Sequence, residues 1–506
     1  MKQYVLYKSK KGNRYIFDLE KKKNLLCHPV LYYLAELEDK GTDLEKWISE
    51  LKEALEIQAV GAFTKEEIEY YYKKYLLLKR NGHFGDISRE QSLGGKLTPE
   101  DVRELLANIS QVTLETTEKC CFKCLYCGYG EFYLPRDARS EKSLEFSSVE
   151  KIFTYLLEYW NSPLNRSVGK NIYISFYGGE PLLNFKLIED VVNYMKNLDL
   201  RHNRLTFSMT TNGVLLEKHI DFLVENEFNL LISLDGDETG NDYRVFKDGN
   251  PAFPAIMENI AALRSKYPDY FARKVSFNAV IHNKNSIAGV YRFFKEQFGK
   301  IPRIASLNSF GIREEQKQAF REMYSNLDDS LYKNEDYSLI QREMFINLPN
   351  IQVLSDFLHT HTDFCFINYN DLLYETDDKT RFPTGTCDPF AKKLFVTANG
   401  KILPCERINH EYFLGAVDEH GVEIDFDGIA AKYNRWYDKI VSQCRACYQS
   451  ENCTQCIFYL DLSATRTKCS GFMNREDFAR YVNSQVDFLE AEPGMYFKIL
   501  KEVVIK

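Results

Sequence analysis

The sequence lacks the long apolar runs of membrane and secreted proteins. Within its 506 residues no stretch is long and apolar enough to span a bilayer, and no apolar segment follows the start as in a secretory signal. Positive charge is not in excess either: the net charge is −8, which favours neither nucleic acid nor a membrane surface as a partner. Hydrophobic content of 44% and aromatic content of 14% predict a globular cytoplasmic protein of about two to three domains.

Cysteine, in contrast, is abundant. The chain has 13 cysteines, gathered in one group near residue 124 and another between residues 387 and 469. Without a secretory signal these cysteines are not expected to form a disulfide framework, and their clustering favours metal binding. Cys27 and Cys121 fall outside the recurring spacings, so we expect them to be bystanders.

Three of the thiols follow the spacing C-x3-C-x2-C at Cys120, Cys124 and Cys127. A [4Fe–4S] cluster normally takes four thiolates, so three protein ligands leave one iron open to bind a substrate or cofactor. Zinc is the alternative, but this stretch offers no fourth ligand at zinc spacing. The motif therefore favours an iron–sulfur site.

With aromatic Tyr126 just before the last cysteine, this motif resembles that of the radical S-adenosylmethionine (SAM) enzymes. The resemblance implies that the cofactor's amino and carboxylate groups chelate the open iron. It also implies that the reduced cluster cleaves the cofactor to a 5′-deoxyadenosyl radical, with electrons from a low-potential donor of the flavodoxin or ferredoxin type. An anaerobic setting follows, because exposed clusters are oxygen-sensitive.

Residues 110–312 alternate strand and helix patterns, which predicts an α/β fold with a parallel sheet. The expected strands are Val112–Glu115, Asn171–Tyr177, Leu205–Met209, Asn229–Leu234, Lys274–Ile281 and Arg303–Leu307. Ser147 and Glu150 predict a capping box for the first helix between them. The pattern indicates a partial, TIM-like (β/α)6 radical SAM barrel, whose chemistry would lie at the carboxyl ends of the strands.

The motif Gly178-Gly179-Glu180-Pro181 ends the second of these strands. Two glycines let the backbone approach a ligand closely, and carbonyls with a carboxylate suit an ammonium group. Alone the motif is compatible with an ordinary turn. The resemblance implies that it holds the methionyl amino group of the cofactor.

Polar residues also end the next two strands. Ser208 and Asn212 offer hydroxyl and amide groups suited to a ribose. The resemblance places a serine and an arginine like Ser233 and Arg244 against the cofactor, and a guanidinium there would pair with the methionyl carboxylate. The alternative for Arg244 is a surface salt bridge.

Residues 1–80 are expected to form a separate module. Strands at Tyr4–Tyr7 and Tyr15–Leu19 precede three helices, which begin at Pro29, after Asp43, and at a capping box of Thr64 and Glu67. This order resembles the winged-helix-like leader-peptide recognition domain of peptide-modifying radical enzymes, which would bind a leader as an added strand. A structural cap is the alternative.

The remaining segments are less informative. Residues 81–109 are expected to be a linker, 313–380 a helical bridging region, and 476–506 a helical tail. His359 and His361 are two positions apart and would not share a helix face, so we do not expect them to bind metal.

The C-terminal cysteines, in residues 381–475, closely resemble the twin-cluster extension known as SPASM. The resemblance implies that Cys444, Cys447, Cys453 and Cys469 hold one auxiliary [4Fe–4S] cluster, and that Cys387, Cys405 and Cys456 hold the other. A zinc ribbon is the alternative, but seven cysteines exceed one zinc site.

Two departures from the SPASM pattern concern the second of these clusters. The last internal spacing is x2, where the family usually has x3, and Arg381 stands near the position of an additional family cysteine. An open iron, or a distant ligand such as Cys365, is therefore expected there. An open iron would accept a peptide thiolate directly.

Together these features predict a maturase of ribosomal peptides that abstracts a hydrogen atom and closes an oxidative cross-link, most simply a thioether. The N-terminal module and the open auxiliary iron favour a cysteine-containing precursor with a leader. Glu406, directly after Cys405, stands where sulfatase maturases carry an aspartate base and is a candidate base here. The alternatives are oxidation of a sulfatase cysteine or serine to formylglycine, an aromatic carbon–carbon or carbon–oxygen cross-link, and a non-catalytic iron–sulfur protein that escorts a peptide.

Overall fold

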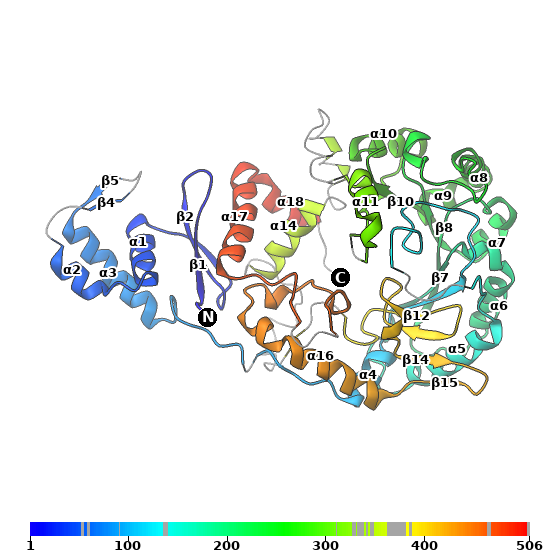
Figure 1. Ribbon diagram of the computed structural model, residues 1–506, viewed down its shortest axis with the longest axis horizontal. Coiled ribbons are helices and arrows are strands. Elements are labelled where there is room, and N and C mark those ends of the chain that lie inside the picture. Colours follow the sequence, from blue (N-terminus) through cyan, green and yellow to red (C-terminus); the bar gives the residue numbers. More distant parts are fainter. Residues whose placement is uncertain are drawn as a thin grey trace.

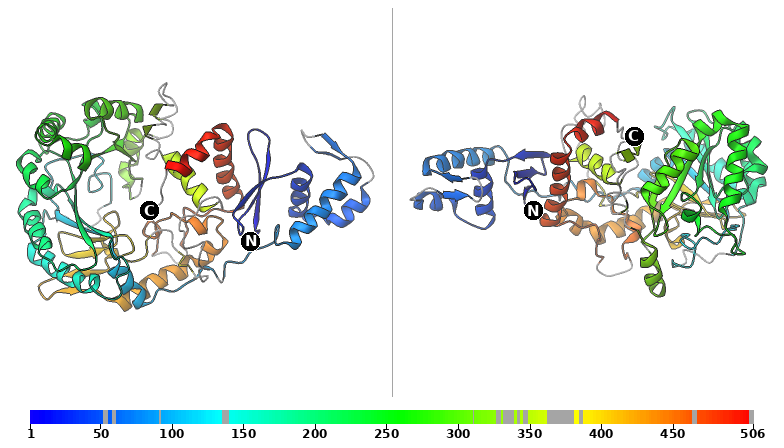
Figure 2. Two further views of the ribbon diagram at one scale, coloured as in Figure 1. Left: turned by 180° about the vertical axis from the view of Figure 1, so that it is seen from behind. Right: turned by 90° about the horizontal axis from the view of Figure 1, so that it is seen from above.

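The computed structural model describes the chain except residues 52–54, 58–60, 91, 135–139, 310, 326–329, 331–338, 341–342, 345–348, 362–380, 384–386, 463–466 and 503–506. Figure 1 shows a small N-terminal module at one end, a large α/β region at the other, and C-terminal segments between them. The view from above keeps the same order (Figure 2). No helix among the described residues is long and apolar enough to cross a membrane.

Six parallel strands form the α/β region. They are β6 (Gln111–Thr117), β7 (Asn171–Gly178), β8 (Arg204–Thr211), β9 (Asn229–Ser233), β10 (Val275–Ile281) and β11 (Arg303–Ser306), and they are hydrogen-bonded in chain order. The helices between them are α5 (Phe146–Trp160), α6 (Phe185–Lys196), α7 (Ile220–Glu225), α8 (Phe253–Lys266), α9 (Pro268–Lys274) and α10 (Ile287–Phe298). The predicted strands and the partial barrel are confirmed.

The amino-terminal end of α5 differs from the prediction. The helix begins at Phe146 behind an N-cap residue, Glu145, that makes no side-chain cap hydrogen bond. Ser147 therefore lies inside the first turn, and the predicted capping box with Glu150 is wrong. Phe146 packs edge-on against Tyr194 of α6, with ring centroids 5.8 Å apart, so tertiary packing takes precedence over the local cap.

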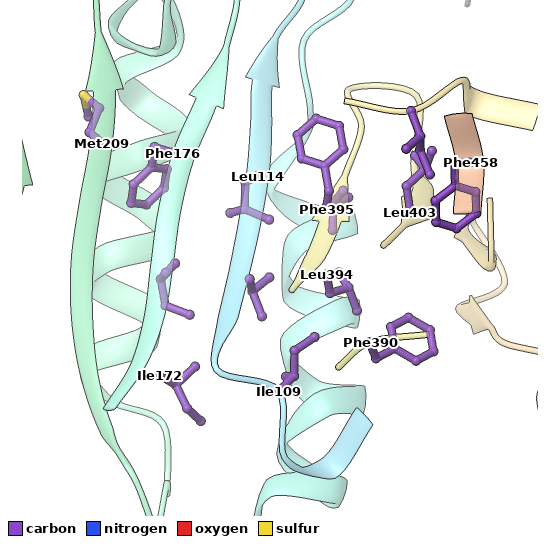
Figure 3. Packing of buried hydrophobic residues seen from close by; sticks show 14 of the residues in the cluster. Ile109, Leu114, Ile172, Phe176, Met209, Phe390, Leu394, Phe395, Leu403 and Phe458 are labelled. Atoms are coloured by element: carbon purple, nitrogen blue, oxygen red, sulfur yellow. The ribbon is translucent and has the colours of Figure 1, made fainter. Parts of the chain in front are cut away.

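The C-terminal cysteine region continues the barrel sheet. Strand β12 (Leu394–Val396) pairs in parallel with β6, and β13 (Lys401–Leu403), β14 (Gly415–Val417) and β15 (Val422–Glu423) follow in antiparallel order. Figure 3 shows Phe395 of β12 beside Leu114 of β6, in one row of buried side chains with Phe176 of β7. The predicted 381–475 unit is thus joined to the barrel through a continuous sheet and core.

Helix α16 (Phe426–Ala446) leads from this sheet to the last cysteines, past η7 (Ser450–Asn452) and η8 (Ile457–Tyr459). It packs against α4 (Pro99–Ala107), which lies inside the predicted 81–109 linker. That segment is therefore partly helical. Thr98 and Asp101 form a capping box for α4, and Val102 and Leu106 are fully buried, which explains why the helix forms.

The N-terminal module has a three-stranded antiparallel sheet of β1 (Tyr4–Lys8), β2 (Arg14–Asp18) and β3 (Lys23–Leu26). Its helices are α1 (Pro29–Asp39), α2 (Leu44–Glu50) and α3 (Lys65–Arg80), with a small hairpin of β4 (Leu55–Ile57) and β5 (Gly61–Phe63). The Asp43 cap and the Thr64–Glu67 capping box are confirmed. Strand β3 and the β4–β5 hairpin were not predicted.

Both faces of this sheet are covered. Tyr4 and Ile16 belong to the core shared with α1 and α3, whereas Val5 and Phe17 belong to the main core. The main-core face meets α17 (Arg475–Ala491), where the rings of Phe17 and Phe478 are 5.6 Å apart. The predicted helical tail thus serves as one wall of the N-terminal module. The other described helices are α11 (Lys317–Met323), α14 (Pro349–Thr360) and α18 (Gly494–Glu502).

Candidate active site

A cavity of about 790 Å³ lies at the carboxyl ends of the parallel strands. Ten of the residues predicted from the sequence line it: Cys120, Cys124, Tyr126, Cys127, Gly178, Gly179, Asn212, Ser233, Arg244 and Glu406. Three predicted residues, Glu180, Pro181 and Ser208, are not part of its lining. Residues from four different strand ends and from the C-terminal region therefore meet at one place.

The cysteine loop is held between β6 and the segment after β9. Phe122 forms a bridge with Phe246, their rings meet at 5.2 Å, and the Lys123 N–H donates to the Val245 carbonyl at 2.8 Å. The Asn212 amide donates to the Cys121 sulfur at 3.3 Å. These contacts hold the loop against the cavity with all three predicted ligands in its lining.

The donor set suits an iron–sulfur cluster. Three thiols from one loop line an accessible cavity, and each thiolate of a cluster binds a separate iron. Among the described residues no three His, Cys, Asp or Glu side chains stand close enough to share a single ion. A cluster spreads its ligands further apart than one ion does, so the three cysteines fit a cluster.

The glycines after β7 are required by a close approach of two strands. A Cβ on Gly178 would lie 2.4 Å from the Thr117 carbonyl oxygen, and one on Gly179 would lie 2.1 Å from that of Lys119. Gly178 also has a φ of +131°. The glycines thus let the end of β7 pack against the cysteine loop, which leaves their backbone on the cavity wall.

Glu180 is fully buried and turns away from the cavity. Its carboxylate accepts hydrogen bonds from the Thr211 hydroxyl at 2.8 Å, the Asn212 N–H at 2.7 Å and the Leu182 N–H at 3.1 Å. Burial raises the pKa of Glu180 to about 7 although these hydrogen bonds oppose the shift. The carboxylate therefore fixes the ends of β7 and β8 to each other, which places Asn212 beside the cysteines.

Arg244 is paired within the protein. Its Nε and Nη2 donate to the Asp235 carboxylate at 2.8 and 3.2 Å, and both side chains are buried. Burial alone would lower the pKa of Arg244, but the Asp235 carboxylate raises it. The Tyr126 hydroxyl donates to the same carboxylate, and the guanidinium lies 5.6 Å from the centre of the Tyr126 ring. The alternative interpretation, in which Arg244 forms a salt bridge on the protein surface, is wrong, because both Arg244 and Asp235 are buried.

Asp235 thus organises one wall of the cavity. Besides Arg244 and Tyr126 it accepts the Val280 N–H at 2.8 Å, and its own N–H donates to Asn241 at 3.0 Å. The sequence analysis assigned Asp235 no role. A carboxylate directly after a parallel strand, nine positions before an arginine, was the available signal.

Ser208 lies deeper in the barrel than the cavity. Its hydroxyl is within 2.6 Å of the Ser175 hydroxyl, which in turn accepts from Gln111 at 2.9 Å. Thr210, two residues further along β8, lines the cavity instead. Residues two positions apart on a strand point to the same face of the sheet. Ser208 and Thr210 therefore share a face, and Thr210 is the one nearer the carboxyl end of β8, where the cavity lies.

Glu406 reaches the cavity from the C-terminal region, together with Arg407 and Tyr459, which the sequence analysis did not assign. The Lys393 ammonium donates to both Glu406 oxygens, at 3.2 and 3.0 Å. Burial alone would raise the pKa of Glu406, but Lys393 holds it below its usual range. Glu406 is therefore an ionised carboxylate in the lining of the cavity.

The four-cysteine group, Cys444, Cys447, Cys453 and Cys469, converges on a second cavity of about 30 Å³. The other side chains around it are mainly apolar, among them Ile440, Ile457 and Phe472. Four thiols around one small, apolar space match the ligand number of a [4Fe–4S] cluster.

The three-cysteine group consists of Cys387 before β12, Cys405 after β13 and Cys456 before η8. The thiols of Cys387 and Cys456 are hydrogen-bonded, and Cys405 lies within electrostatic range of both. Arg381 stands apart from this group, because its guanidinium donates to the Glu451 carbonyl at 3.1 Å. Cys365, the predicted distant ligand, lies outside the described residues.

The two histidines considered in the sequence analysis have structural surroundings. His359 Nδ1 contacts the Ser355 carbonyl at 2.8 Å within α14. His361 is buried among aromatic rings of both ends of the chain, at 5.8 Å from Phe17 and 5.4 Å from Phe478.

Comparisons with known proteins agree with this geometry. Residues 114–295 match the Radical SAM superfamily. The chain is 26% identical over 329 residues to the cysteine-type anaerobic sulfatase-maturating enzyme of Clostridium novyi, covering 62% of this chain and 78% of that protein. It is 21% identical over 351 residues to the radical SAM cyclopropyl synthase TigE of Paramaledivibacter caminithermalis, covering 69% of this chain and 66% of that protein.

A solved structure shares the fold. Native anSMEcpe with bound AdoMet and Kp18Cys peptide superposes with a TM-score of 0.51 at 19% identity, covering 78% of this chain and 99% of that one. At 19% identity this similarity is evidence for the fold alone.

Proposed function

Because the chain carries a radical SAM domain and is a radical SAM enzyme, we propose that it matures a ribosomally made, cysteine-containing precursor peptide by forming an intramolecular thioether cross-link. The observation that carries this proposal is the composition of the 790 Å³ cavity. One part of its lining is the cysteine loop, and another is Glu406, Arg407 and Tyr459 from beside the three-cysteine group. A peptide side chain in this cavity would lie between the two.

Each part of the lining has a distinct task in this proposal. When bound to Cys120, Cys124 and Cys127, a [4Fe–4S] cluster supplies the electron for cleavage of S-adenosylmethionine. Asn212, Ser233 and the backbone of Gly178–Gly179 offer the cofactor hydrogen-bonding groups on the same wall. Asp235 holds Arg244 and Tyr126 rigidly beside it, which excludes alternative rotamers and keeps the cavity shape fixed.

Glu406 is the proposed proton acceptor. A carboxylate kept ionised by Lys393 accepts the proton that a peptide thiol or an oxidised carbon loses as the new bond forms. The three-cysteine group, one residue away along the chain, is the proposed site of one auxiliary [4Fe–4S] cluster, and the four-cysteine group is the site of the other. Electrons would come from a flavodoxin or ferredoxin type of donor.

The N-terminal module is the proposed leader-binding site. Strand β3 is the edge of its sheet, and Leu25 and Leu26 on this strand are 41% and 67% exposed. A leader adding as a fourth strand would pair with the β3 backbone and cover these two side chains. Figure 1 places the module at the opposite end of the molecule from the barrel, so the leader and the reacting residues must be well separated in the precursor.

The similar proteins support a second candidate function. The sulfatase-maturating relative supports oxidation of a cysteine to formylglycine, in which Glu406 would again accept a proton. The cyclopropyl synthase relative supports a carbon–carbon bond as a variant of the cross-link. Strand β3 and its exposed leucines favour a leader-bearing precursor over a sulfatase.

The test is anaerobic co-expression with a small cysteine-containing peptide encoded beside this gene, followed by tandem mass spectrometry. A thioether gives a loss of two hydrogens, about 2 Da, with no fragmentation between the two linked residues. An unmodified precursor together with aldehyde formation on a sulfatase motif peptide would replace the proposal with the formylglycine reaction. Cys124→Ala must abolish 5′-deoxyadenosine formation, since a variant that still forms it has a different cofactor site.

The leader site has its own test. The Cys27 N–H donates to the Arg14 carbonyl on β2, so the N–H of Leu26, one residue earlier, faces away from the sheet. Leu26→Pro removes that outward donor and Leu26→Ala keeps it. We expect Leu26→Pro to abolish processing of the full precursor while uncoupled cofactor cleavage continues. Equal processing by both variants would refute strand addition at β3.

A further inference from the structure

One buried hydroxyl near the three-cysteine group has no hydrogen-bond partner among the described residues. It belongs to Tyr433, in the middle of α16, whose side chain is 0% exposed. A buried hydroxyl without a partner destabilises the folded protein. Such a group is rarely retained in a packed core unless something in the working protein satisfies it.

The surroundings of Tyr433 identify that partner. Cys387, Asp388 and Cys456 all lie within electrostatic range of its hydroxyl. The ring is held by Trp436 at 5.0 Å and by Phe458 at 6.2 Å, so the hydroxyl cannot turn to solvent. The hydroxyl is therefore enclosed near the two cysteines, because Phe458 lies two residues after Cys456 and Asp388 follows Cys387.

A second tyrosine in the same helix provides a contrast. Tyr437, one turn further along α16, is also buried, but its hydroxyl donates to Asp388 at 2.9 Å. The two rings lie 6.0 Å apart. Both hydroxyls lie within electrostatic range of Cys387, but of the two only that of Tyr433 has no hydrogen-bond partner among the described residues.

We propose that the Tyr433 hydroxyl donates a hydrogen bond to a sulfur of the cluster held by Cys387, Cys405 and Cys456. This inference rests on the proposed assignment of a cluster to that group. Thiolate and sulfide sulfurs accept hydrogen bonds, and the acceptor gains charge on reduction, so the bond stabilises the reduced cluster and raises its reduction potential. Tyr433 is thus a positioning residue that tunes this cluster and leaves the four-cysteine group unaffected.

The experiment compares reconstituted Tyr433→Phe and Tyr437→Phe in a background where Cys120, Cys124 and Cys127 are alanine, which removes the cofactor-binding cluster. Redox titration is followed by electron paramagnetic resonance, with iron and sulfide analysis of each protein. We expect Tyr433→Phe to shift one auxiliary signal to lower potential, without loss of iron. Tyr437→Phe should leave both potentials in place, because its hydroxyl bonds to Asp388.

Three outcomes would overturn the inference. If Tyr433→Phe leaves the reduction potential unchanged, then the proposed hydrogen bond does not exist. If Tyr437→Phe shifts the potential equally, then the shift reflects general packing in the helix. Loss of iron in Tyr433→Phe would make the oxygen a ligand instead of a donor. If the triple-alanine background protein, with both tyrosines present, binds only about four irons per chain, then the three-cysteine group holds no cluster. In that case the proposed function itself is at fault.

Discussion

The two cysteine groups of the C-terminal region differ in how the chain builds them. The four-cysteine group comes from one stretch, 444–469, and closes on a small apolar space. The three-cysteine group draws on three separate segments, around Cys387, Cys405 and Cys456, and Glu406 beside it reaches the substrate cavity. The first is a complete and enclosed ligand set. The second has fewer cysteines and adjoins the place where chemistry is proposed.

Their neighbours differ in the same sense. Beside the four-cysteine group, Arg89 donates to the Cys447 carbonyl and the Ser450 hydroxyl, and Arg445 donates to the Leu93 carbonyl at 2.9 Å. These contacts tie the group to the segment that leads from the N-terminal module. Under the proposed function, we therefore expect the four-cysteine group to support the fold and the three-cysteine group to take part in the reaction.

The largest effect is expected from removing one ligand of each group. Cys453→Ala and Cys405→Ala should each lose about four irons per chain. Cys453→Ala should also lower the melting temperature more than Cys405→Ala does. The reason is that a cluster bound by the four-cysteine group would contribute folding free energy at the junction with the N-terminal module. Iron analysis and thermal unfolding under anaerobic conditions measure both, with Cys27→Ser as the control that loses no iron. Equal melting temperatures for the two alanine variants would contradict the division of tasks.

Arg89 provides the next largest effect. Its side chain is only 4% exposed, and it makes two hydrogen bonds beside Cys447. Arg89→Met leaves those acceptors without a donor, so we expect a loss of about 2 kcal/mol in stability, seen as a lower thermal midpoint. Lys96→Met is the matched control, because its ion pair with Asp438 is exposed and contributes little. A midpoint unchanged by Arg89→Met would show that this junction does not depend on the buried guanidinium.

The sequence predicted the parts whose signal is local. The six barrel strands are short apolar-rich segments that alternate with helical patterns, and the caps at Asp43 and Thr64 follow directly from side-chain chemistry at helix starts. Spacing alone identified the C-x3-C-x2-C loop at Cys120, Cys124 and Cys127. The division of the C-terminal thiols into two groups came from the resemblance to SPASM, and the members of each group lie near one another.

The remainder depends on contacts between distant segments. Strand β12 has only three residues, and nothing in Leu394–Val396 reveals that it extends the barrel beside β6. Strand β3 is mostly exposed and begins with lysine, so it gave no hydrophobic pattern. Arg89 and Tyr433 have no motif spacing at all. Their roles come from burial beside a site, which only the folded arrangement reveals.

A pH effect is expected at the junction beside the four-cysteine group. Burial lowers the pKa of His361 to about 4, and Arg89 also disfavours its protonation. The unfolded chain takes up a proton near pH 6.5 and the folded chain does not, so stability is complete above about pH 6.5 and falls toward pH 4. The expected loss by pH 5 is about 2 kcal/mol. His361→Phe keeps an aromatic ring and should flatten this dependence in thermal unfolding; a parallel decline in both proteins would contradict it.

The smallest effect is expected on the reactive side, at the ion pair of Lys393 and Glu406. Lys393→Met removes the charge that holds the pKa of Glu406 below its usual range, so burial then raises that pKa. A base must be deprotonated to work, so the acid limb of the rate of peptide modification should move to higher pH, while formation of 5′-deoxyadenosine keeps its own profile. Lys392→Met, on the exposed neighbouring residue, is the control. If the acid limb stays in place when Lys393 is replaced, then Glu406 does not accept the proton. The C-terminal region would then supply cluster ligands near the cavity but no catalytic base.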